Sequence, residues 1–199
     1  MEEFKFSTIE TMSTDKVLTV DSFRGRYGFE TLKDINLLLS DESAVLSLPI
    51  ESTYRQDYEH LRKMVTEKRF GLNIKDNQLE LCPLKIEDVN FLAGKIFTHE
   101  TTDMSLAAID NPSDNFTYIA VEGSSIAHGN LNPDQEGYVI EIDAEKLFAL
   151  RSVYLDPESI PFSHSKIELG KSFIFAGGIP KEAVRRTRKV LQFGNSNKK

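Results

Sequence analysis

The chain has 199 residues, of which 40% are hydrophobic and 28% are charged, and its formal net charge is −7. This composition is expected of one globular domain that buries a sizeable core, and the negative charge argues against a protein that coats nucleic acid. The sequence holds no apolar run of membrane-spanning length, and its acidic start MEEFKFSTIE does not resemble a secretory signal, so a soluble cytoplasmic protein without membrane partners is expected.

The N-terminal half is predicted to be mostly helical. Tyr58, Leu61 and Met64 form one apolar stripe at helical spacing, and Gly71 suits the C-cap of that helix. The dipeptide Asp76-Asn77 favours a tight turn between two short strands. The expected elements, in chain order, are a strand and turn at 16–29, a short helix at 30–43, an extended segment around Pro49, a helix at 57–71 and a hairpin at 72–84.

The C-terminal half is predicted to alternate strands with short helices. Pro180 suits the first turn of a helix, and the glycines at 177 and 178 permit a sharp bend before it. The expected elements are a short helix entering a strand at 85–97, a short helix at 101–115, a strand that stops at Gly123, a strand turning helical at 138–150, an irregular stretch at 151–165, a strand at 171–176 and a terminal helix at 180–191.

This order of elements predicts the α+β class. We expect a single compact domain over residues 1–193, with a mixed, largely antiparallel split sheet and flanking short helices. Residues 1–52 are a candidate N-terminal extension of that domain, and residues 194–199 are expected to form a disordered tail.

The C-terminal end is basic although the chain as a whole is acidic. From Lys181 onward there are seven Lys or Arg residues against the single acid Glu182. A solvated helix face is the favoured interpretation of such a run. A phosphate or nucleic-acid site on this segment is the alternative, and it is the one place where nucleic acid is a candidate partner.

Familiar metal-binding and catalytic patterns do not occur in the sequence. Cys82 is the only cysteine, which excludes an internal disulfide and a multi-cysteine metal site. The acids and amides of DNPSDNFTYIAVE lack the spacing of a calcium-binding loop. The four histidines are scattered singly, and His99 is the candidate among them because it falls between a strand and a helix cap. We therefore expect no metal site.

Three separated segments match one known pattern when they are taken together. They are STYRQDYEHLRKMVTEKRFGL with its Tyr-Arg-x-Asp, FTHETTDMSLAAI, and KSFIFAGGIP with its Gly-Gly-Ile-Pro. In this order they resemble the mono-ADP-ribosyltransferase toxin superfamily, particularly its cholera- and pertussis-toxin-like group. The resemblance covers about residues 53–190. It implies an enzyme that takes ADP-ribose from NAD and transfers it to a macromolecular acceptor, with a protein as the expected acceptor and a bacterial or phage toxin or effector as the expected context.

The resemblance also implies roles for particular residues. Arg55 would bind the NAD pyrophosphate through bidentate, charge-assisted hydrogen bonds. A hydroxyl at Thr101 or Thr102 would support a catalytic carboxylate, which stabilises the oxocarbenium-like state formed as the glycosidic bond to nicotinamide breaks. Glu168 is the candidate for that carboxylate.

The sequence departs from the family where the family places its catalytic glutamate. That position, five residues before Gly177, holds Ser172 with Lys171 beside it. Glu168 is the nearest upstream acid and would reach the site if the strand bulges or begins early. The alternative is a chain that keeps the fold, has lost the reaction and acts as a protein-binding module.

Two further alignments remain open at the first site strand. One uses Arg24, which lies in the Phe-Arg-Gly setting of VDSFRGRYGF. The other uses His99 of FTHET as the first-strand residue, with Tyr118 or Tyr138 stacking on nicotinamide. Under each alignment the protein acts in the cytoplasm or is delivered into a target cell.

Overall fold

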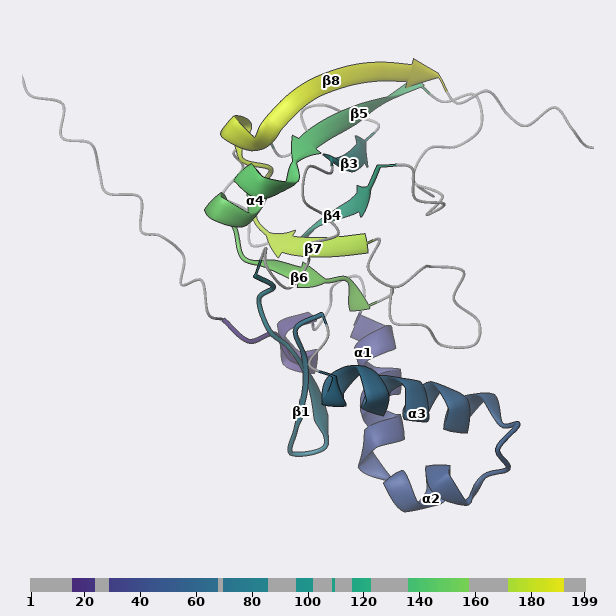
Figure 1. The fold of residues 1–199 in the computed structure, drawn as a ribbon. Coiled ribbons are helices and arrows are strands. Elements are labelled where there is room, and N and C mark those ends of the chain that lie inside the picture. Colours follow the sequence, from purple (N-terminus) through teal and green to yellow (C-terminus); the bar gives the residue numbers. More distant parts are fainter. Residues whose placement is uncertain are drawn as a thin grey trace, which may run out of the picture.

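The computed structural model shows an antiparallel sheet with one helix at an end of it and the N-terminal helices grouped beside one of its edges (Figure 1). The α+β class is therefore confirmed. Several residues singled out from the sequence lie outside the described residues, namely Arg24, Thr102, Glu168, Lys171 and the tail 194–199. The structure describes residues 16–23, 29–67, 70–85, 96–101, 109, 116–122, 136–157 and 172–191.

The secondary structure alternates in the order expected of an α+β chain. Asp41 caps α2 by accepting a hydrogen bond from the Ala44 amide, and Asp143 caps α4 by accepting one from the Lys146 amide. The helical elements are η1 (Val20–Phe23), α1 (Phe29–Ser40), α2 (Glu42–Ser47), α3 (Thr53–Thr66), α4 (Ala144–Leu150) and η4 (Lys181–Ala183). The strands are β1 (Leu72–Lys75), β2 (Gln78–Leu81), β3 (Ile96–Thr101), β4 (Phe116–Val121), β5 (Glu136–Asp143), β6 (Val153–Leu155), β7 (Ser172–Ala176) and β8 (Val184–Leu191).

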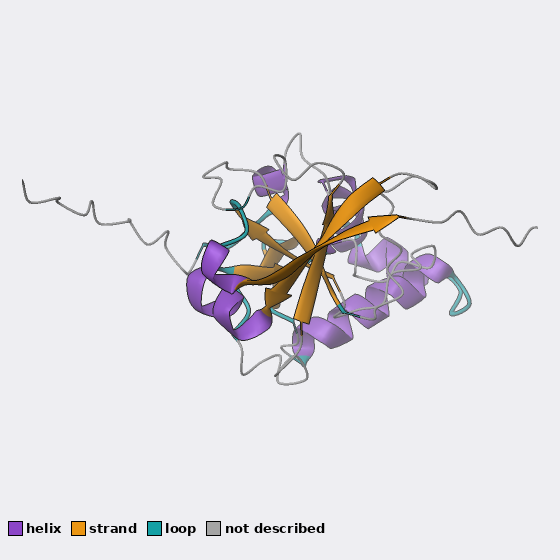
Figure 2. Cartoon of the chain, turned by 90° about the horizontal axis from the view of Figure 1, so that it is seen from above, coloured by secondary structure: helices purple, strands orange, loops and turns teal. Residues whose placement is uncertain are grey.

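Six of these strands form one antiparallel sheet in the order β6-β7-β4-β3-β5-β8, and β1 pairs with β2 in a separate hairpin. Seen from above, the strands of the large sheet cross one another at clear angles, as the twist of a sheet requires (Figure 2). The strands β3 and β4 lie at its centre, so side chains on them are flanked by neighbours on both sides. The sheet is the element that positions the candidate site.

Both faces of the six-stranded sheet bury apolar side chains, and a row of polar side chains crosses one of them. The other face packs against α4, where the ring of Phe97 lies 6.4 Å from that of Phe148 and 5.4 Å from that of Phe173, measured between centroids. Ile140 and Phe175, which lie on the same face, are completely buried. This face supplies much of the core, since burial of apolar side chains is the main favourable term in folding.

The N-terminal segments attach to the sheet at its β6 and β7 side. Phe23 stacks on Phe116 of β4 at 4.8 Å between ring centroids, and the Tyr154 hydroxyl donates to the Lys16 carbonyl at 2.6 Å. The Leu84 amide donates to the Val153 carbonyl at 2.8 Å. Described residues between 16 and 84, such as Leu18, Phe23 and Leu84, therefore share one hydrophobic core with the sheet.

Several expected elements are confirmed. The helix around the Tyr58, Leu61 and Met64 stripe forms and buries those three side chains, although it begins at Thr53. The hairpin turns at Asp76 and Asn77, whose φ angles of 50° and 58° are those of a two-residue turn that matches strand twist. The helix at 30–43, the strand stopping before Gly123 and the strand turning helical at 138–150 are present as α1, β4, and β5 with α4.

Other expected elements are wrong. Within 16–29, the described residues 16–23 contain a short helical turn and a bridge from Leu18 to Leu81 in place of the expected strand, and residues 24–28 lie outside the described residues. The extended segment expected around Pro49 is confined to the few residues between α2 and α3, where Leu48 and Ser52 have extended backbones. The irregular stretch at 151–165 contains β6.

The largest correction concerns the terminal helix expected at 180–191. Only one turn, η4, is helical there, and the basic segment that follows is the edge strand β8, paired along its length with β5. The alternating residues of β5 offered an open edge, and pairing with it satisfies the backbone of β8. Arg185 lies at a bulge where the register of β5 and β8 shifts. A bulge and a row of charges are common devices that prevent an edge strand from pairing further.

Candidate functional site

A row of polar side chains crosses the other face of the large sheet. Paired residues on neighbouring strands point to the same face, so the register fixes which side chains share it. Asp156, which follows β6, joins the row beside Ser172, because its amide donates to the Ser172 carbonyl at 3.2 Å. The register gives the polar row as Ser172 beside Ala120, Ala120 beside Thr98, Thr98 beside Glu141 and Glu141 beside Arg186.

The polar row is buried, which is costly for polar groups. Thr98, Ser172, Glu141 and Asp156 are 8%, 6%, 5% and 3% exposed. Within the part of the chain that the structure describes, they are four of the five buried polar or charged residues. Burying a polar group without a compensating partner costs free energy, so the groups of this row are expected to be hydrogen-bonded.

One end of the polar row is a carboxylate held by a hydroxyl. Ser172 is the first residue of β7, and its Oγ donates to Asp156 Oδ2 at 2.7 Å. The same hydroxyl lies 3.5 Å from the Ile119 carbonyl. The hydrogen bond fixes the carboxylate of Asp156 at the start of β7, next to the central strands.

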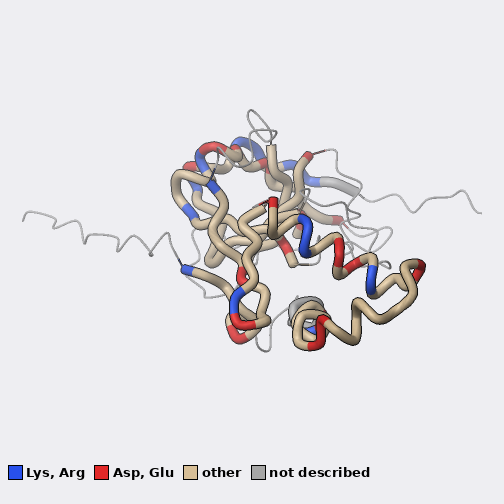
Figure 3. The backbone as a smooth tube through the Cα atoms, turned by 60° about the horizontal axis from the view of Figure 1, so that its bottom comes forward, with Lys and Arg blue, Asp and Glu red and all other residues tan. Residues whose placement is uncertain are grey.

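The other end of the polar row is a carboxylate held by two arginines. Arg186 binds Glu141 through two hydrogen bonds of 2.8 and 3.2 Å, and Arg188 Nε donates to Glu141 Oε1 at 2.7 Å. The hydrogen bond from Arg186 is the main cause that lowers the pKa of the Glu141 carboxyl. Lys189 pairs with Glu136 farther along the same two strands. Basic residues of β8 thus lie beside acids of β5 (Figure 3).

Glu100 lies one step from the row on the same face. It is two residues from Thr98 on β3, and its partner in the register is Val139. Desolvation by burial raises the pKa of its carboxyl. The pKa shifts of Glu100 and Glu141 therefore have opposite directions, because desolvation dominates at the half-buried Glu100 and the hydrogen bond from Arg186 dominates at Glu141.

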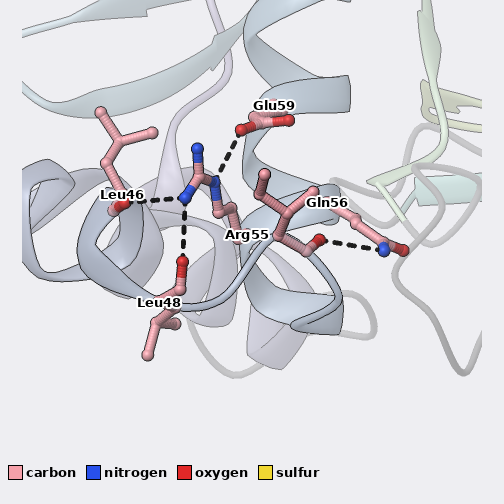
Figure 4. Close-up of polar contacts among 6 residues, drawn as sticks. Leu46, Leu48, Arg55, Gln56 and Glu59 are labelled. Atoms are coloured by element: carbon pink, nitrogen blue, oxygen red, sulfur yellow. Dashed lines mark hydrogen bonds and ion pairs between the residues drawn. The ribbon is translucent and has the colours of Figure 1, made fainter.

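Arg55 does not lie on a strand. It is in the first turn of α3, and its guanidinium is bound within the helical layer (Figure 4). Nη1 donates to the carbonyls of Leu46 and Leu48 at 3.1 and 2.9 Å, and Nε donates to Glu59 at 2.9 Å. The strand setting that the resemblance implies for this residue is therefore wrong. These bonds close the corner between α2 and α3 and engage Nε and Nη1, two of the guanidinium donors that a pyrophosphate would need.

His99, Thr101 and Tyr138 are brought together, but on the opposite face from the polar row. Thr101 pairs with Tyr138, and His99 is two residues from Thr101 on β3. His99 Nδ1 lies 2.7 Å from the Tyr118 carbonyl. Tyr118 itself is two residues from Ala120 on β4, so its side chain belongs to the face of the polar row and not to that of His99.

Sequence reasoning missed Asp156 and the shared face of Thr98, Ser172 and Glu141. Asp156 stands in VYLDP, whose sequence carries no motif, and its relation to Ser172 arises only from the pairing of β6 with β7. The alternation of acids in YVIEID was a usable signal, because it predicts that Glu141 shares a face with other polar residues once β5 is an inner strand of the sheet.

Comparisons of the chain with protein-family models, with curated proteins and with solved structures find no match. Within the described ranges, no group of three or more His, Cys, Asp or Glu side chains is arranged to hold a metal ion. No helix among those residues is long and apolar enough to cross a membrane. The function is therefore inferred from the chain's own residues and their arrangement.

Proposed function

We propose that this chain is an ADP-ribosyltransferase-like protein that takes NAD as its substrate on the face of the polar row. It would transfer ADP-ribose to a macromolecular acceptor, with a protein as the acceptor class, in the cytoplasm of its own or of a target cell. The observation that supports this proposal is the register from Ser172 through Ala120 to Thr98. The segments that carry the resemblance, FTHET and KSFIFAGGIP, contribute these two hydroxyls to one face.

The chemistry of NAD cleavage fits a buried row of hydroxyls and carboxylates. Breaking the bond between ribose and nicotinamide develops positive charge on the ribose, and fixed polar groups aimed at that charge lower the barrier most when water is excluded. Thr98 Oγ lies 3.4 Å from the Ala120 carbonyl, so the hydroxyl is held at the centre of the sheet. Ala120 between the two hydroxyls adds only a methyl group to this face.

The two faces of the sheet make a sharp test of where NAD binds. Thr98 and Thr101 stand on the same strand but face opposite sides, and each can be changed to Val, which keeps the shape and removes the hydroxyl. Calorimetry with NAD⁺ on the folded wild type should detect binding. Thr98→Val should weaken it about 3- to 10-fold, the worth of about one hydrogen bond, and Thr101→Val should leave it unchanged.

Weaker NAD⁺ binding by Thr101→Val, with unchanged binding by Thr98→Val, would indicate that NAD⁺ binds on the face of His99, Thr101 and Tyr138. A folded wild type without detectable binding at millimolar NAD⁺ would refute the proposal. Circular dichroism and thermal unfolding of each variant control for loss of structure, which matters because Thr98 is buried.

A second candidate function is a protein-binding module that keeps this fold without the reaction. The observation that favours it is Ser172 at the position where the resemblance implies a glutamate, since a hydroxyl does not replace a carboxylate in stabilising a cation. Under this alternative the wild type binds a protein partner and releases no nicotinamide. The two functions therefore separate in a single assay of NAD⁺ turnover.

A further inference from the structure

We infer that Arg186 and Arg188 bind the pyrophosphate of NAD, and that Glu141 holds both guanidinium groups in place for it. The inference rests on the proposed function and names the charged groups that bind its substrate. A pyrophosphate is an anion, so a site for NAD needs basic side chains on the same face as the hydroxyls. The observation is a pair of solvent-exposed arginines that share one buried carboxylate at the end of the polar row.

Both arginines lie on the face of the polar row. Arg186 pairs with Glu141, and Glu141 pairs with Thr98, so the three side chains share that face. Arg188 lies two residues farther along β8 and binds the same carboxylate. Neighbouring strands are about 4.8 Å apart, which places the backbone of Arg186 about 10 Å from that of Thr98. Only one ribose separates the pyrophosphate from the bond to nicotinamide, so one NAD molecule along the row can contact Thr98 and the arginines.

Glu141 fixes the two guanidinium groups before a ligand arrives. Arg186 donates from Nε and Nη2 to the carboxylate at 3.2 and 2.8 Å, and Arg188 donates from Nε at 2.7 Å. The carboxylate is itself held in the sheet, where 5% of the residue is exposed. A ligand that meets side chains already in position loses less conformational entropy on binding.

Both guanidinium groups keep donors for an anion. Arginine carries N–H groups on Nε, Nη1 and Nη2. Within the described part of the chain, Arg188 uses only Nε, and Arg186 uses Nε and Nη2. The side chains of Arg188 and Arg186 are 43% and 62% exposed, so a ligand can approach the remaining donors from solvent. Guanidinium donors bind phosphate oxygens in pairs, through charge-assisted hydrogen bonds.

A pair of cations beside one carboxylate leaves positive charge at this end of the row. Glu122, which is exposed after the end of β4, also acts on Arg186, but its effect is weaker than that of Glu141. A compact diphosphate needs only a few fixed donors, whereas nucleic acid binds through many phosphate contacts along its length. The arginine pair therefore suits a dinucleotide better than a nucleic acid.

Other basic side chains suit the pyrophosphate less well. Arg55 donates from Nε and Nη1 within the helical layer. Lys189 follows Arg188 on β8, but it pairs with Tyr138 and so faces the opposite side of the sheet, where it binds Glu136. Lys189 is 54% exposed. It is therefore a matched control for Arg188, with the same charge on the same strand and the opposite face.

The test measures binding by calorimetry with two parts of the NAD molecule. ADP-ribose keeps the pyrophosphate and lacks nicotinamide, whereas nicotinamide riboside keeps the bond that breaks and lacks phosphate. Arg188→Gln is expected to weaken ADP-ribose binding at least about tenfold, because charge-assisted hydrogen bonds to phosphate are stronger than neutral ones. Its affinity for nicotinamide riboside should stay within about threefold of the wild type. Lys189→Gln should bind both ligands within about threefold of the wild type.

Nicotinamide release from NAD⁺ gives a second readout. A pyrophosphate is bound equally in the substrate and in the transition state, so Arg188→Gln should raise KM about tenfold and leave kcat within about threefold. Arg188→Lys keeps the positive charge beside Glu141 and removes the paired donors. It is expected to weaken ADP-ribose binding about fivefold. If Arg188→Gln does not fold, wild-type affinity for ADP-ribose in folded Arg188→Lys overturns the inference.

The outcomes separate this inference from the proposed function. Equal loss of ADP-ribose binding in Arg188→Gln and Lys189→Gln overturns the inference, because net charge then accounts for the effect. A wild type that releases nicotinamide, with unchanged ADP-ribose binding in Arg188→Gln, overturns the inference and leaves the proposed function standing. Binding of ADP-ribose that depends on Arg188, without any nicotinamide release, supports the pyrophosphate site and overturns the transferase. A folded wild type that binds neither ADP-ribose nor NAD⁺ overturns both.

Discussion

Arg55 has a structural role in the helical layer, which differs from the phosphate-binding role that the resemblance implies. Its guanidinium ties together the end of α2, the following loop and α3 through three hydrogen bonds, and 25% of its side chain is exposed. Arg55→Ala is expected to lower the free energy of unfolding by about 1–2 kcal/mol, mostly from the two carbonyl bonds, since the partly exposed pair with Glu59 contributes little. Urea unfolding measures this loss.

Arg62→Ala is the matched control on the same helix. Arg62 makes only a 3.9 Å contact with Glu42, and both side chains are about half exposed, so we expect a loss below about 0.5 kcal/mol. NAD⁺ affinity should not change in either variant. Unchanged stability with lost NAD⁺ binding in Arg55→Ala would restore the phosphate-binding role that the sequence suggested.

Glu141 makes the stability of the fold depend on pH. Because Arg186 and Arg188 hold the pKa of this carboxyl below that of the unfolded chain, its contribution is fully present above the unfolded pKa. The contribution is lost as pH falls through the lowered pKa of the folded chain. Glu141→Gln should therefore be less stable than the wild type at pH 7 and should approach it below about pH 4.

Thermal unfolding from pH 7 to pH 3 measures this convergence. Glu136→Gln is the control, because Glu136 pairs with Lys189 at an exposed position and should change the melting temperature little at any pH. A constant difference between Glu141→Gln and the wild type across the whole range would show that the ion pairs do not carry the effect.

At the scale of elements, the basic C-terminal segment is part of the sheet, because it forms the edge strand β8. Its backbone pairs with β5 from Glu136 to Ile142, and Arg186, Arg188 and Lys189 bind acids of that strand. A chain that ends at Pro180 would expose the edge of β5 and leave Glu141 buried without its arginines. We expect this truncated chain to lose cooperative thermal unfolding, or to aggregate, whereas a chain that ends at residue 193 should unfold like the full protein.

This truncation tests whether the basic segment after Pro180 is a strand that the fold requires or a tail that it can lose. A chain ending at Pro180 with the melting temperature of the full protein would contradict the pairing of β8. The same ion pairs reduce the charge that β8 presents to phosphates, so we expect only weak nucleic-acid binding by the full chain.

Elements defined by neighbouring residues were predictable from the sequence, and elements defined by distant partners were not. The α3 stripe and the Asp76-Asn77 turn are local patterns, and both form as expected. The segment after Pro180 carries the start signal of a helix, but its partner β5 lies about 45 residues earlier, and pairing with that strand overrides local propensity. β6 was missed for the same reason, since its three residues are too few to show a period.

The candidate site was also predictable only in its local features and not in its long-range pairing. Alternation along a strand predicts that Thr98 and His99 face opposite sides, but only the register of β3, β4 and β7 shows that Thr98 shares its face with Ser172. The position of Asp156 depends on a strand that the sequence did not indicate. Residue types that suit a reaction can thus be found from the sequence. Which of them share one face depends on the pairing and register of the strands, which the sequence does not show.

At the scale of the whole molecule, both faces of the sheet bury apolar side chains, and the polar row crosses one of these faces. The face opposite the polar row carries Phe97, Ile140 and Phe175, with Phe97 next to Phe148 of α4, and this burial supplies stability that offsets the costly polar row. The N-terminal helices and hairpin join that core beside β6 and β7, near Asp156. The residues proposed to act on NAD therefore lie on a rigid central element, which suits a site that must hold its groups in fixed positions.

The release of nicotinamide from NAD⁺ by the folded wild-type chain tests the central claim most directly. We expect time-dependent release of nicotinamide in proportion to the concentration of the chain. The amount released should equal the amount of free ADP-ribose plus the amount attached to an acceptor protein. A folded chain that releases no nicotinamide above the rate of NAD⁺ in buffer, with or without candidate protein acceptors, would contradict it.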